Sequence, residues 1–226
     1  MAIILALLYK NIEEQYYTSD GKNLTAVNDT YSDLKISVKC EIIQNKCFYQ
    51  LLSLRSFTFE ENSNLVSIGS QSFYECKNLT AIDLSSCHKL KIIYNSAFSK
   101  CINVSYINLP EGLREIQGSV FSGISLITSI TIPQSVEILG PSVFSECRKL
   151  KTINFVEGSK LKIIDYFFIS QTNISSFEIP ENVEKIDGGA FFETKIKTLT
   201  LNTKNQFLTI ENGIVYSKNK SNLYLF

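Results

Sequence analysis

Cysteine and histidine are the side chains here that could act as nucleophiles, bases or metal ligands. The chain has six Cys and one His among 226 residues. No two cysteines have the Cys-x-x-Cys spacing of a zinc or redox site. The lone histidine, His88, directly follows Cys87, and adjacent residues rarely converge on one ligand, so we expect it in a surface turn. We therefore expect no metal site, no cofactor and no catalytic triad.

Paired carboxylates are the remaining source of acid–base chemistry. Asp83 and Glu178 are the only acids at one outward position of a sequence repeat, and they lie four repeats apart. Repeats that stack at about 4.8 Å would separate the two carboxylates by roughly 19 Å. The carboxylates of glycosidases lie within about 9.5 Å of each other. The two acids cannot cooperate, and we expect no enzymatic activity.

The charge and hydropathy of the chain limit the kinds of partner that it can bind. The 22 basic residues balance 22 acidic ones, and the sequence has no run of Lys or Arg, so the counterion release that drives nucleic-acid binding is missing. The apolar run from Ala2 to Tyr9 has eight residues, whereas a membrane-spanning helix needs about 20. We expect this segment not to insert into a membrane. It lacks a basic leading region and a clear cleavage site, which favours a buried terminal element, or the stump of a longer chain, over a signal peptide.

A repeat of 23 to 25 residues organises the chain. Seven of the 15 phenylalanines recur at this interval: Phe48, Phe73, Phe98, Phe121, Phe144, Phe168 and Phe191. Apolar residues lie eight and five positions before six of these seven Phe residues, and six, nine and eleven positions after most of them. In the fifth full unit, Leu161 and Ile164 lie one residue closer to Phe168, which predicts a deletion in the turn before that Phe.

The last two apolar positions of each unit flank a polar residue, an alternation that is typical of a β-strand. A three-residue strand that occurs once per unit must pair with its equivalents in neighbouring units. Parallel stacking at about 4.8 Å makes seven strands span roughly 29 Å and turns the Phe, Leu and Ile columns into ladders inside the coil. Phe98 and Phe121 should then be in contact.

The pattern predicts three regions. Residues 34–204 form a mostly β solenoid of about seven units of 22–25 residues, with short parallel strands along one face and irregular or short helical turns opposite. Residues 1–33 form an N-terminal capping segment with a hairpin at Asp20-Gly21, and residues 205–226 form a hairpin or meander at Asn212-Gly213 that begins a longer region.

Two further patterns support this register. The turn after the strand is short where a proline follows it, at Pro110, Pro133 and Pro180, because proline cannot donate to the ladder. On the other side of the coil, one repeated position alternates in charge over its later members, and opposite charges stacked there stabilise neighbouring coils by roughly 0.2 to 1 kcal/mol per pair. The residues at this position are Val66, Lys91, Arg114, Glu137, Lys162 and Glu184.

The pattern L-x-x-I-x-x-x-A-F-x-x-C-x-x-L-x-x-I-x-L-P is nearly intact from Leu90 to Pro110. It resembles the BspA-like leucine-rich repeat family over about residues 34 to 204, and the hairpin NGIVYSKNKSNLYLF is similar to an insert common in that family. The resemblance implies a leucine-rich repeat solenoid, frequent in surface proteins of mucosal bacteria and parasitic protists and associated with adhesion to host proteins or other cells. It carries no catalytic residues.

Cys76, Cys101 and Cys147 share the position three residues after the Phe, where the family pattern also places Cys. We expect buried free thiols, because unpaired Cys packs as a small hydrophobe. A disulfide between Cys76 and Cys101 is the alternative. Adjacent coils bring their Cα atoms within range, but parallel side chains make the required dihedral angle awkward.

Asparagine glycosylation remains open, conditional on secretion. Six Asn-x-Ser/Thr sequences occur, at Asn23, Asn28, Asn78, Asn103, Asn173 and Asn219. Three of them, Asn78, Asn103 and Asn173, occupy the same repeat position, so the repeat itself explains their presence.

The outer face of the predicted strands is the candidate partner-binding surface, because solenoids commonly bind along such extended faces. Its residues are small, neutral and rich in hydroxyl groups, with one aromatic: Ser56, Thr58, Ala81, Asp83, Tyr106, Asn108, Ser129, Thr131, Thr152, Asn154, Ser176, Glu178, Thr198 and Thr200. We expect a non-catalytic protein-binding module of a cell-surface adhesion protein or surface antigen, at the cell surface or extracellular, whose partner is a host or extracellular-matrix protein or another cell surface. The alternative is an intracellular, cytoplasmic scaffold for protein–protein interaction.

Overall fold

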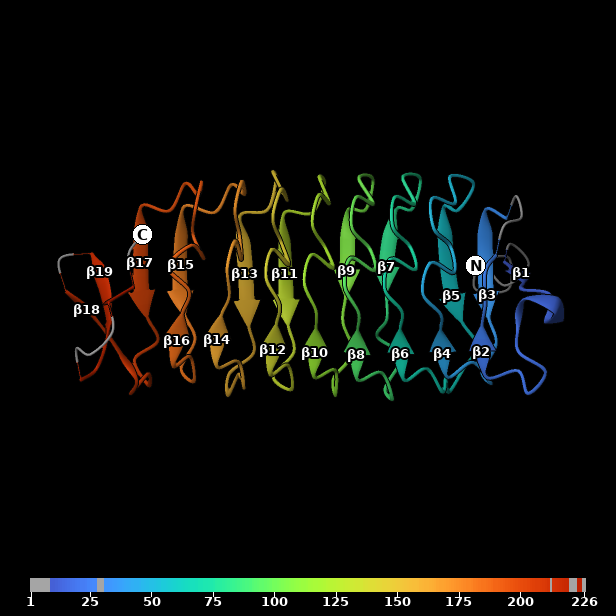
Figure 1. Ribbon diagram of the computed structural model, residues 1–226, viewed down its shortest axis with the longest axis horizontal. Helices are drawn as coiled ribbons and strands as arrows, with labels where there is room; N and C mark the ends of the chain where they lie inside the picture. Colours follow the sequence, from blue (N-terminus) through green and yellow to red (C-terminus); the bar gives the residue numbers. More distant parts are fainter. Residues whose placement is uncertain (1–8, 28–30, 212, 220–222, 225–226) are drawn as a thin grey trace, which may run out of the picture.

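The computed structural model describes residues 9–27, 31–211, 213–219 and 223–224. The chain winds as an elongated coil, and Figure 1 shows the strands of successive turns side by side along its long axis. Nearly every turn of the coil contributes one strand to each of two parallel ladders. The predicted leucine-rich repeat solenoid is confirmed.

The first ladder contains the strands that the sequence predicted. They pair in parallel as β1-β3-β5, β7-β9, β11-β13 and β15-β17, and the groups lie beside one another in that order (Figure 1). The bounds are β1 Lys10–Asn11, β3 Asp33–Ile36, β5 Ser56–Phe59, β7 Ala81–Asp83, β9 Tyr106–Asn108, β11 Ser129–Ile132, β13 Thr152–Phe155, β15 Ser176–Ile179 and β17 Thr198–Leu201.

The second ladder runs along the side where we expected irregular or short helical turns. Its two-residue strands pair in parallel as β2-β4-β6-β8-β10-β12 and as β14-β16. The bounds are β2 Asn23–Leu24, β4 Ile42–Ile43, β6 Ser67–Ile68, β8 Ile92–Ile93, β10 Glu115–Ile116, β12 Ile138–Leu139, β14 Ile163–Ile164 and β16 Lys185–Ile186. Within the described residues the single helical element is η1, a 3-10 turn at Glu14–Tyr16.

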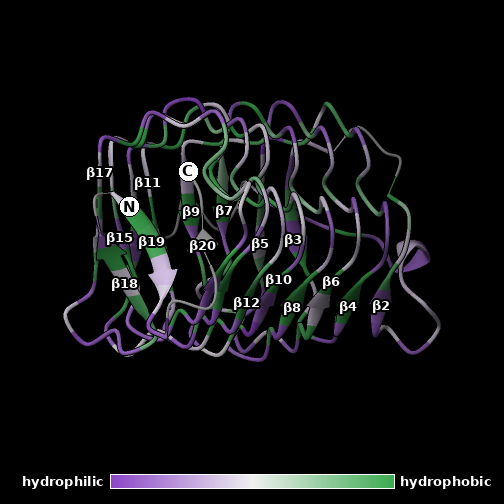
Figure 2. Cartoon of the chain, turned by 60° about the vertical axis from the view of Figure 1, so that its left-hand side comes forward, coloured by the Kyte–Doolittle hydropathy of each residue, from purple (hydrophilic) through white to green (hydrophobic). Residues whose placement is uncertain are grey.

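Columns of buried side chains fill the coil between the ladders. The rings of Phe73 and Phe98 stack at 4.8 Å, and those of Phe98 and Phe121 stack at 6.1 Å with an interplanar angle of 12°. The predicted contact between Phe98 and Phe121 is therefore confirmed. Figure 2 shows hydrophobic and hydrophilic residues alternating within the turns of the coil, so that each turn buries one set and exposes the other.

The predicted position of the deletion in the fifth full unit was wrong. The amide of Phe121 donates to the carbonyl of Val143 (3.1 Å), and the amide of Phe144 donates in the same way to Phe168 (3.2 Å). Phe168 therefore occupies the position of Val143, one before the Phe column, and Ile169 occupies the column itself. Both are fully buried. Leu161 and Ile164 keep their usual spacing to Ile169, so the missing residue lies after the column.

The two ends differ from each other. At the N-terminal end, β1 and β2 extend both ladders, and the predicted hairpin is limited to one antiparallel bridge between Tyr17 and Leu24, with Gly21 at φ +72° in the turn. At the C-terminal end, β18 (Leu208–Glu211), β19 (Ile214–Ser217) and β20 (Leu223–Tyr224) form the predicted antiparallel meander. Asn212 of its turn and residues 1–8, including most of the apolar run, lie outside the described residues.

No helix in the described part of the chain has the length and apolar character to cross a membrane.

Candidate functional site

The candidate surface is the outer face of the first ladder, which we call the sheet face. It includes the fourteen residues predicted from the sequence, and all of them are exposed or half-buried. Register holds within each strand pair, since Ala81 lies opposite Tyr106, and Ser129 lies opposite Thr152. The alternation of the strands therefore directs these side chains outward while their neighbours fill the core.

Two residues of this face were not predicted from the sequence. Asp33 lies opposite Ser56, and Lys35 lies opposite Thr58. The Asp33 carboxylate accepts a hydrogen bond from the Ser56 hydroxyl and another from Ser32, and these bonds lower the pKa of Asp33 below its ordinary value. The strand pair Leu34-x-Ile36 was the available signal, because it places Asp33 and Lys35 on the outer face.

Tyr106 is the main aromatic projection of the sheet face. Its side chain is 52% exposed. Its partner across β7 is Ala81, and Ser129 occupies the same position on β11, so small residues flank the ring on both sides. A large ring that stands above small neighbours is the type of side chain that inserts into a pocket of a partner and dominates interface energy.

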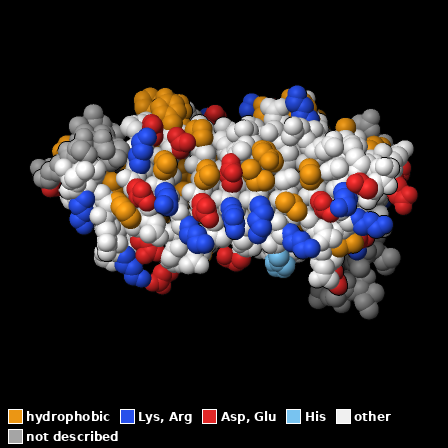
Figure 3. All heavy atoms as spheres, turned by 60° about the horizontal axis from the view of Figure 1, so that its bottom comes forward, with side chains coloured by type: hydrophobic (Ala, Val, Ile, Leu, Met, Phe, Trp, Pro, Cys, Tyr) orange, Lys and Arg blue, Asp and Glu red, His pale blue; other side chains and the backbone are white. Residues whose placement is uncertain are grey.

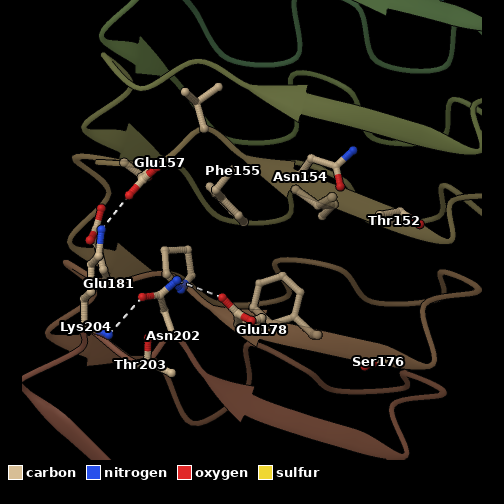
Figure 4. Close-up of a pocket in the computed structure, with 15 residues that line it drawn as sticks. Thr152, Asn154, Phe155, Glu157, Ser176, Glu178, Glu181, Asn202, Thr203 and Lys204 are labelled. Carbon is tan, nitrogen blue, oxygen red and sulfur yellow. Dashed lines mark hydrogen bonds and ion pairs between the residues drawn. The ribbon is translucent and has the colours of Figure 1, made fainter.

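A hollow of about 530 Å³ lies on the sheet face between β13 and β15. The parallel ladder pairs β11 with β13 and β15 with β17, and the hollow lies at the junction between these two pairs. Phe155 is only half-buried here, whereas the equivalent residues Ile132 and Ile179 are fully buried. Phe155, Glu157 and Glu178 all line the hollow (Figure 4). The turn after β13, from Val156 to Lys160, is two residues longer than the turns at Pro133 and Pro180 on either side of it, and the hollow lies where this long turn meets the short turn at Pro180.

Charged and amide side chains line the rim of the hollow (Figure 4). The Lys204 ammonium lies 2.5 Å from Glu157, two coils away along the chain, and Asn202 donates to Glu178 at 2.9 Å. The hydrogen bond and charge of Lys204 lower the pKa of Glu157, and Glu157 in turn raises the pKa of Lys204. Both side chains are exposed, so the pair adds at most about 1 kcal/mol to stability. With Glu181 included, the rim carries more negative than positive charge.

The residues considered for catalysis or metal binding are dispersed. Among the described residues, no three His, Cys, Asp or Glu side chains gather in a way that could hold a metal ion. All six cysteines are buried free thiols, as expected for Cys76, Cys101 and Cys147. Desolvation raises the pKa of Cys76 and Cys147 to about 12, which suppresses the reactive thiolate form.

On the face over the second ladder, residues at equivalent positions of successive coils form rows. Figure 3 shows a row of charged side chains beside a row that is mostly hydrophobic. The charged row is the predicted column: the amide of Glu137 donates to the carbonyl of Arg114 (2.9 Å), and that of Arg114 donates to Lys91 (2.9 Å). Lys162 and Glu184 of the same column form an ion pair at 3.4 Å.

The asparagines at glycosylation sequences differ in their surroundings. Asn78 donates its Nδ2, the atom that would carry a glycan, to the carbonyl of Leu52 at 2.7 Å, and Asn173 accepts from Lys195 at 3.1 Å. Asn103 is exposed. Asn28 lies outside the described residues.

The sequence of the chain matches one known repeat family. The family profile described as BspA type leucine rich repeat region matches residues 27–151 and 91–222, in six copies. No curated protein sequence matches the chain significantly.

Three solved structures are similar in fold. A leucine rich cell surface protein from Faecalibacterium prausnitzii is 22% identical with a TM-score of 0.77, covering 89% of this chain and 55% of that one. The T. pallidum leucine rich repeat protein TpLRR is 19% identical with a TM-score of 0.64, covering 85% and 86%. The pneumococcal vaccine antigen PcpA is 23% identical with a TM-score of 0.60, covering 84% and 48%. The chain therefore spans about half the length of the first and third structures.

Proposed function

This chain belongs to the BspA type leucine-rich repeat family, and from that premise we propose that it is a non-catalytic module that binds a partner protein along the sheet face. The observation that carries the proposal is the face itself, on which all fourteen predicted residues are accessible over seven strands. Tyr106 supplies an aromatic anchor at its centre, and the hollow beside Phe155 supplies a concave site further along.

Cell-surface adhesion is the role we propose for this binding. The structural neighbours include a protein named as a cell surface protein and one named as a vaccine antigen, which supports a location at the cell surface or outside the cell. The partner is then a host or extracellular-matrix protein, or another cell surface. Labelling of intact cells with a membrane-impermeant reagent tests the location, and recovery of the protein only from the cytosol would contradict it.

An intracellular scaffold is the second candidate, and one observation favours it. All six cysteines are free thiols, which is the usual state in a reducing compartment. The same sheet face would then bind a cytosolic protein.

The binding face is tested by substitution. We expect the double variant Tyr106→Ala/Asn108→Ala to weaken binding to a partner captured by the wild-type protein at least tenfold, because loss of a central aromatic anchor commonly costs about 2 kcal/mol or more. The affinity is measured by calorimetric titration. Tyr106 and Asn108 lie on the surface, so the thermal midpoint should move by no more than about two degrees.

Glu137→Ala, on the second-ladder side, is the matched control and should leave the affinity unchanged. Equal affinities for the wild type and the double variant would move the binding site away from the centre of the sheet face.

A further inference from the structure

A cluster of three aromatic side chains lies outside the sheet face, in the long turns that follow β14 and β16. The rings of Tyr166 and Phe167 are 3.9 Å apart, and those of Phe167 and Phe192 are 5.5 Å apart. The side chains of Tyr166 and Phe192 are 47% and 55% exposed. Phe167 is half-buried between them, and two neighbouring rings that remain this exposed do not contribute mainly to the core. Packing in the core therefore does not explain why these surface positions hold aromatic residues.

Tyr166 and Phe167 are exceptions to the repeat, and Phe192 follows a run of serines at its position. Phe167 has a positive φ of 53°, like the residue at the same position in earlier coils: Lys46, Gln71, Ser96, Ser119 and Ser142. The position of Tyr166 is held in those coils by Asn45, Ser70, Asn95, Gly118 and Pro141. The position of Phe192 is held by Tyr49 and Tyr74 in the first two full coils and by serine in the four coils that precede Phe192: Ser99, Ser122, Ser145 and Ser170. Two columns thus change from polar or small residues to aromatic ones, and in the next coil a third column changes from serine back to an aromatic residue.

A glycine makes room for this cluster. An added Cβ at Gly189 would lie 2.3 Å from Cε2 of Tyr166, so any larger residue would displace the ring. The close approach of Gly189 and Tyr166 holds the tyrosine beside Phe167. The arrangement therefore depends on four residues of two neighbouring coils.

The same molecule contains a second aromatic pair at its surface, in the same repeat position as Phe192, whose surroundings differ. The rings of Tyr49 and Tyr74 stack at 5.3 Å in the first two full coils. The Lys46 ammonium lies 5.6 Å from the centroid of the Tyr49 ring, and that of Lys100 lies 5.5 Å from the centroid of the Tyr74 ring. Ammonium groups at this distance are attracted by the negative face of the ring. In the described part of the chain, no Lys ammonium is placed in this way over Tyr166, Phe167 or Phe192.

Carboxylates border the C-terminal cluster. Asp165 accepts from the amide of Tyr166 (2.7 Å), Asp187 accepts from the amide of Gly189 (3.1 Å), and Glu193 accepts from Gln171 (2.7 Å). Each ionised carboxylate has two oxygens with several acceptor positions, so capacity for a further donor remains. Two cations on this side donate to other groups: Lys195 donates to Asn173 at 3.1 Å, and Arg148 donates to Gln171 at 3.4 Å and lies 3.9 Å from the Glu146 carboxylate. Negative charge beside exposed ring faces is complementary to a cation.

We propose that the Tyr166–Phe167–Phe192 cluster binds a Lys or Arg side chain in a basic segment of a partner polypeptide. The cation lies against the rings, as Lys46 and Lys100 do within the chain, and its N–H groups donate to the bordering carboxylates. The surface is separate from the sheet face, so the chain has two binding surfaces. This inference does not depend on what the sheet face binds.

The test is an NMR titration with the peptide acetyl-Gly-Arg-Gly-Arg-Gly-amide, followed on the aromatic resonances of Tyr166 and Phe192. A peptide with citrulline in place of both arginines is neutral and nearly isosteric. We expect the arginine peptide to shift these resonances with a dissociation constant at least fivefold lower than that of the citrulline peptide. The difference should shrink as NaCl is raised, because exposed charges are screened.

Two variants test whether the peptide binds to the faces of the aromatic rings or to apolar surface in general. Phe192→Leu keeps an apolar side chain and removes the ring face, and we expect it to weaken binding of the arginine peptide at least threefold. Tyr49→Leu, in the pair that already carries the chain's own lysines, should leave binding unchanged, as should Tyr106→Ala on the sheet face. Circular dichroism spectra check that each variant is folded.

Three outcomes would overturn the proposal. The first is equal binding of the arginine and citrulline peptides, which would indicate an apolar or hydrogen-bonding site. The second is unchanged binding in Phe192→Leu. The third is concentration-dependent self-association of the wild type that Phe192→Leu abolishes while the peptide does not bind, which would make the cluster a contact between two copies of this chain.

Discussion

Cysteine at the position three residues after the Phe column satisfies a backbone group of the neighbouring coil. In three coils the thiol donates to the carbonyl of the Phe one coil earlier: Cys76 to Phe48 at 3.0 Å, Cys101 to Phe73 at 3.1 Å and Cys147 to Phe121 at 3.1 Å. A small apolar side chain with a weak donor fits a buried site that offers one carbonyl. The structure thus gives these thiols a structural role.

Alkaline pH should destabilise the protein through these thiols. Burial raises the pKa of Cys147 from its ordinary 9.0 to about 12. Below about pH 9 both states keep the thiol proton and the stabilisation is complete; as pH rises toward 12 the unfolded chain loses the proton first, so stability falls. We expect Cys147→Ala to cost about 1 kcal/mol at pH 8 and to lose less stability than the wild type between pH 8 and 10.5, by urea denaturation. Equal slopes would contradict the role of the buried thiol.

At the scale of the strand and turn, neighbouring coils approach closely enough to exclude a side chain. An added Cβ at Gly140 would lie 2.5 Å from the backbone nitrogen of Gly118, and one at Gly69 would lie 2.5 Å from that of Asn45. Both glycines follow a strand of the second ladder, β12 and β6. Absence of a side chain there lets the amide of Gly140 donate to Ile116 at 2.8 Å.

Alanine substitution tests this approach. We expect Gly140→Ala to cost roughly 1 to 3 kcal/mol in the free energy of unfolding, because two backbone segments would have to separate. Gly188→Ala is the matched control: no atom lies within 4 Å of its added Cβ, so its effect should be neutral or slightly stabilising. Denaturant titration measures both. If Gly140→Ala were as stable as the wild type, the coils would be less tightly packed than described.

The whole molecule is a row of coils in which each contacts its neighbours. The aromatic column links them, with Phe121 and Phe144 stacked at 5.8 Å and 9°. The stacking ends where the register changes, since Phe144 and Phe168 meet edge to face at 77°. Stability of such an array is close to a sum of coil and interface terms. A destabilising substitution at one end should therefore affect fewer coils than one in the middle.

Hydrogen exchange should reveal this difference. Phe121→Ala removes a fully buried ring from the middle of the array and should speed exchange in the coils on both sides of it, at a cost of about 3 to 5 kcal/mol. Phe191→Ala should speed exchange in residues 183–217 and leave β5 to β9 close to the wild type. Uniform acceleration across all coils in Phe191→Ala would show that the array unfolds as one unit.

The sequence alone determined the repeat, the buried columns, the first ladder and its fourteen outward residues. It could do so because each coil must bury the same side chains at the same positions to cover its neighbour, so the constraint recurs in the order of residues. Phe98 and Phe121 are predicted to touch for this reason, and Asp33 and Lys35 followed from the same rule but were overlooked.

The tertiary structure decided what depends on contacts between coils of unequal length. Ile169 takes the Phe column because hydrogen bonds from the preceding coil set the register there, and spacing to the nearest Phe cannot reveal that. The hollow beside Phe155 lies where the long turn after β13 meets the short turn at Pro180. The aromatic cluster forms because Phe167 and Phe192, 25 positions apart, become neighbours only when the coils stack.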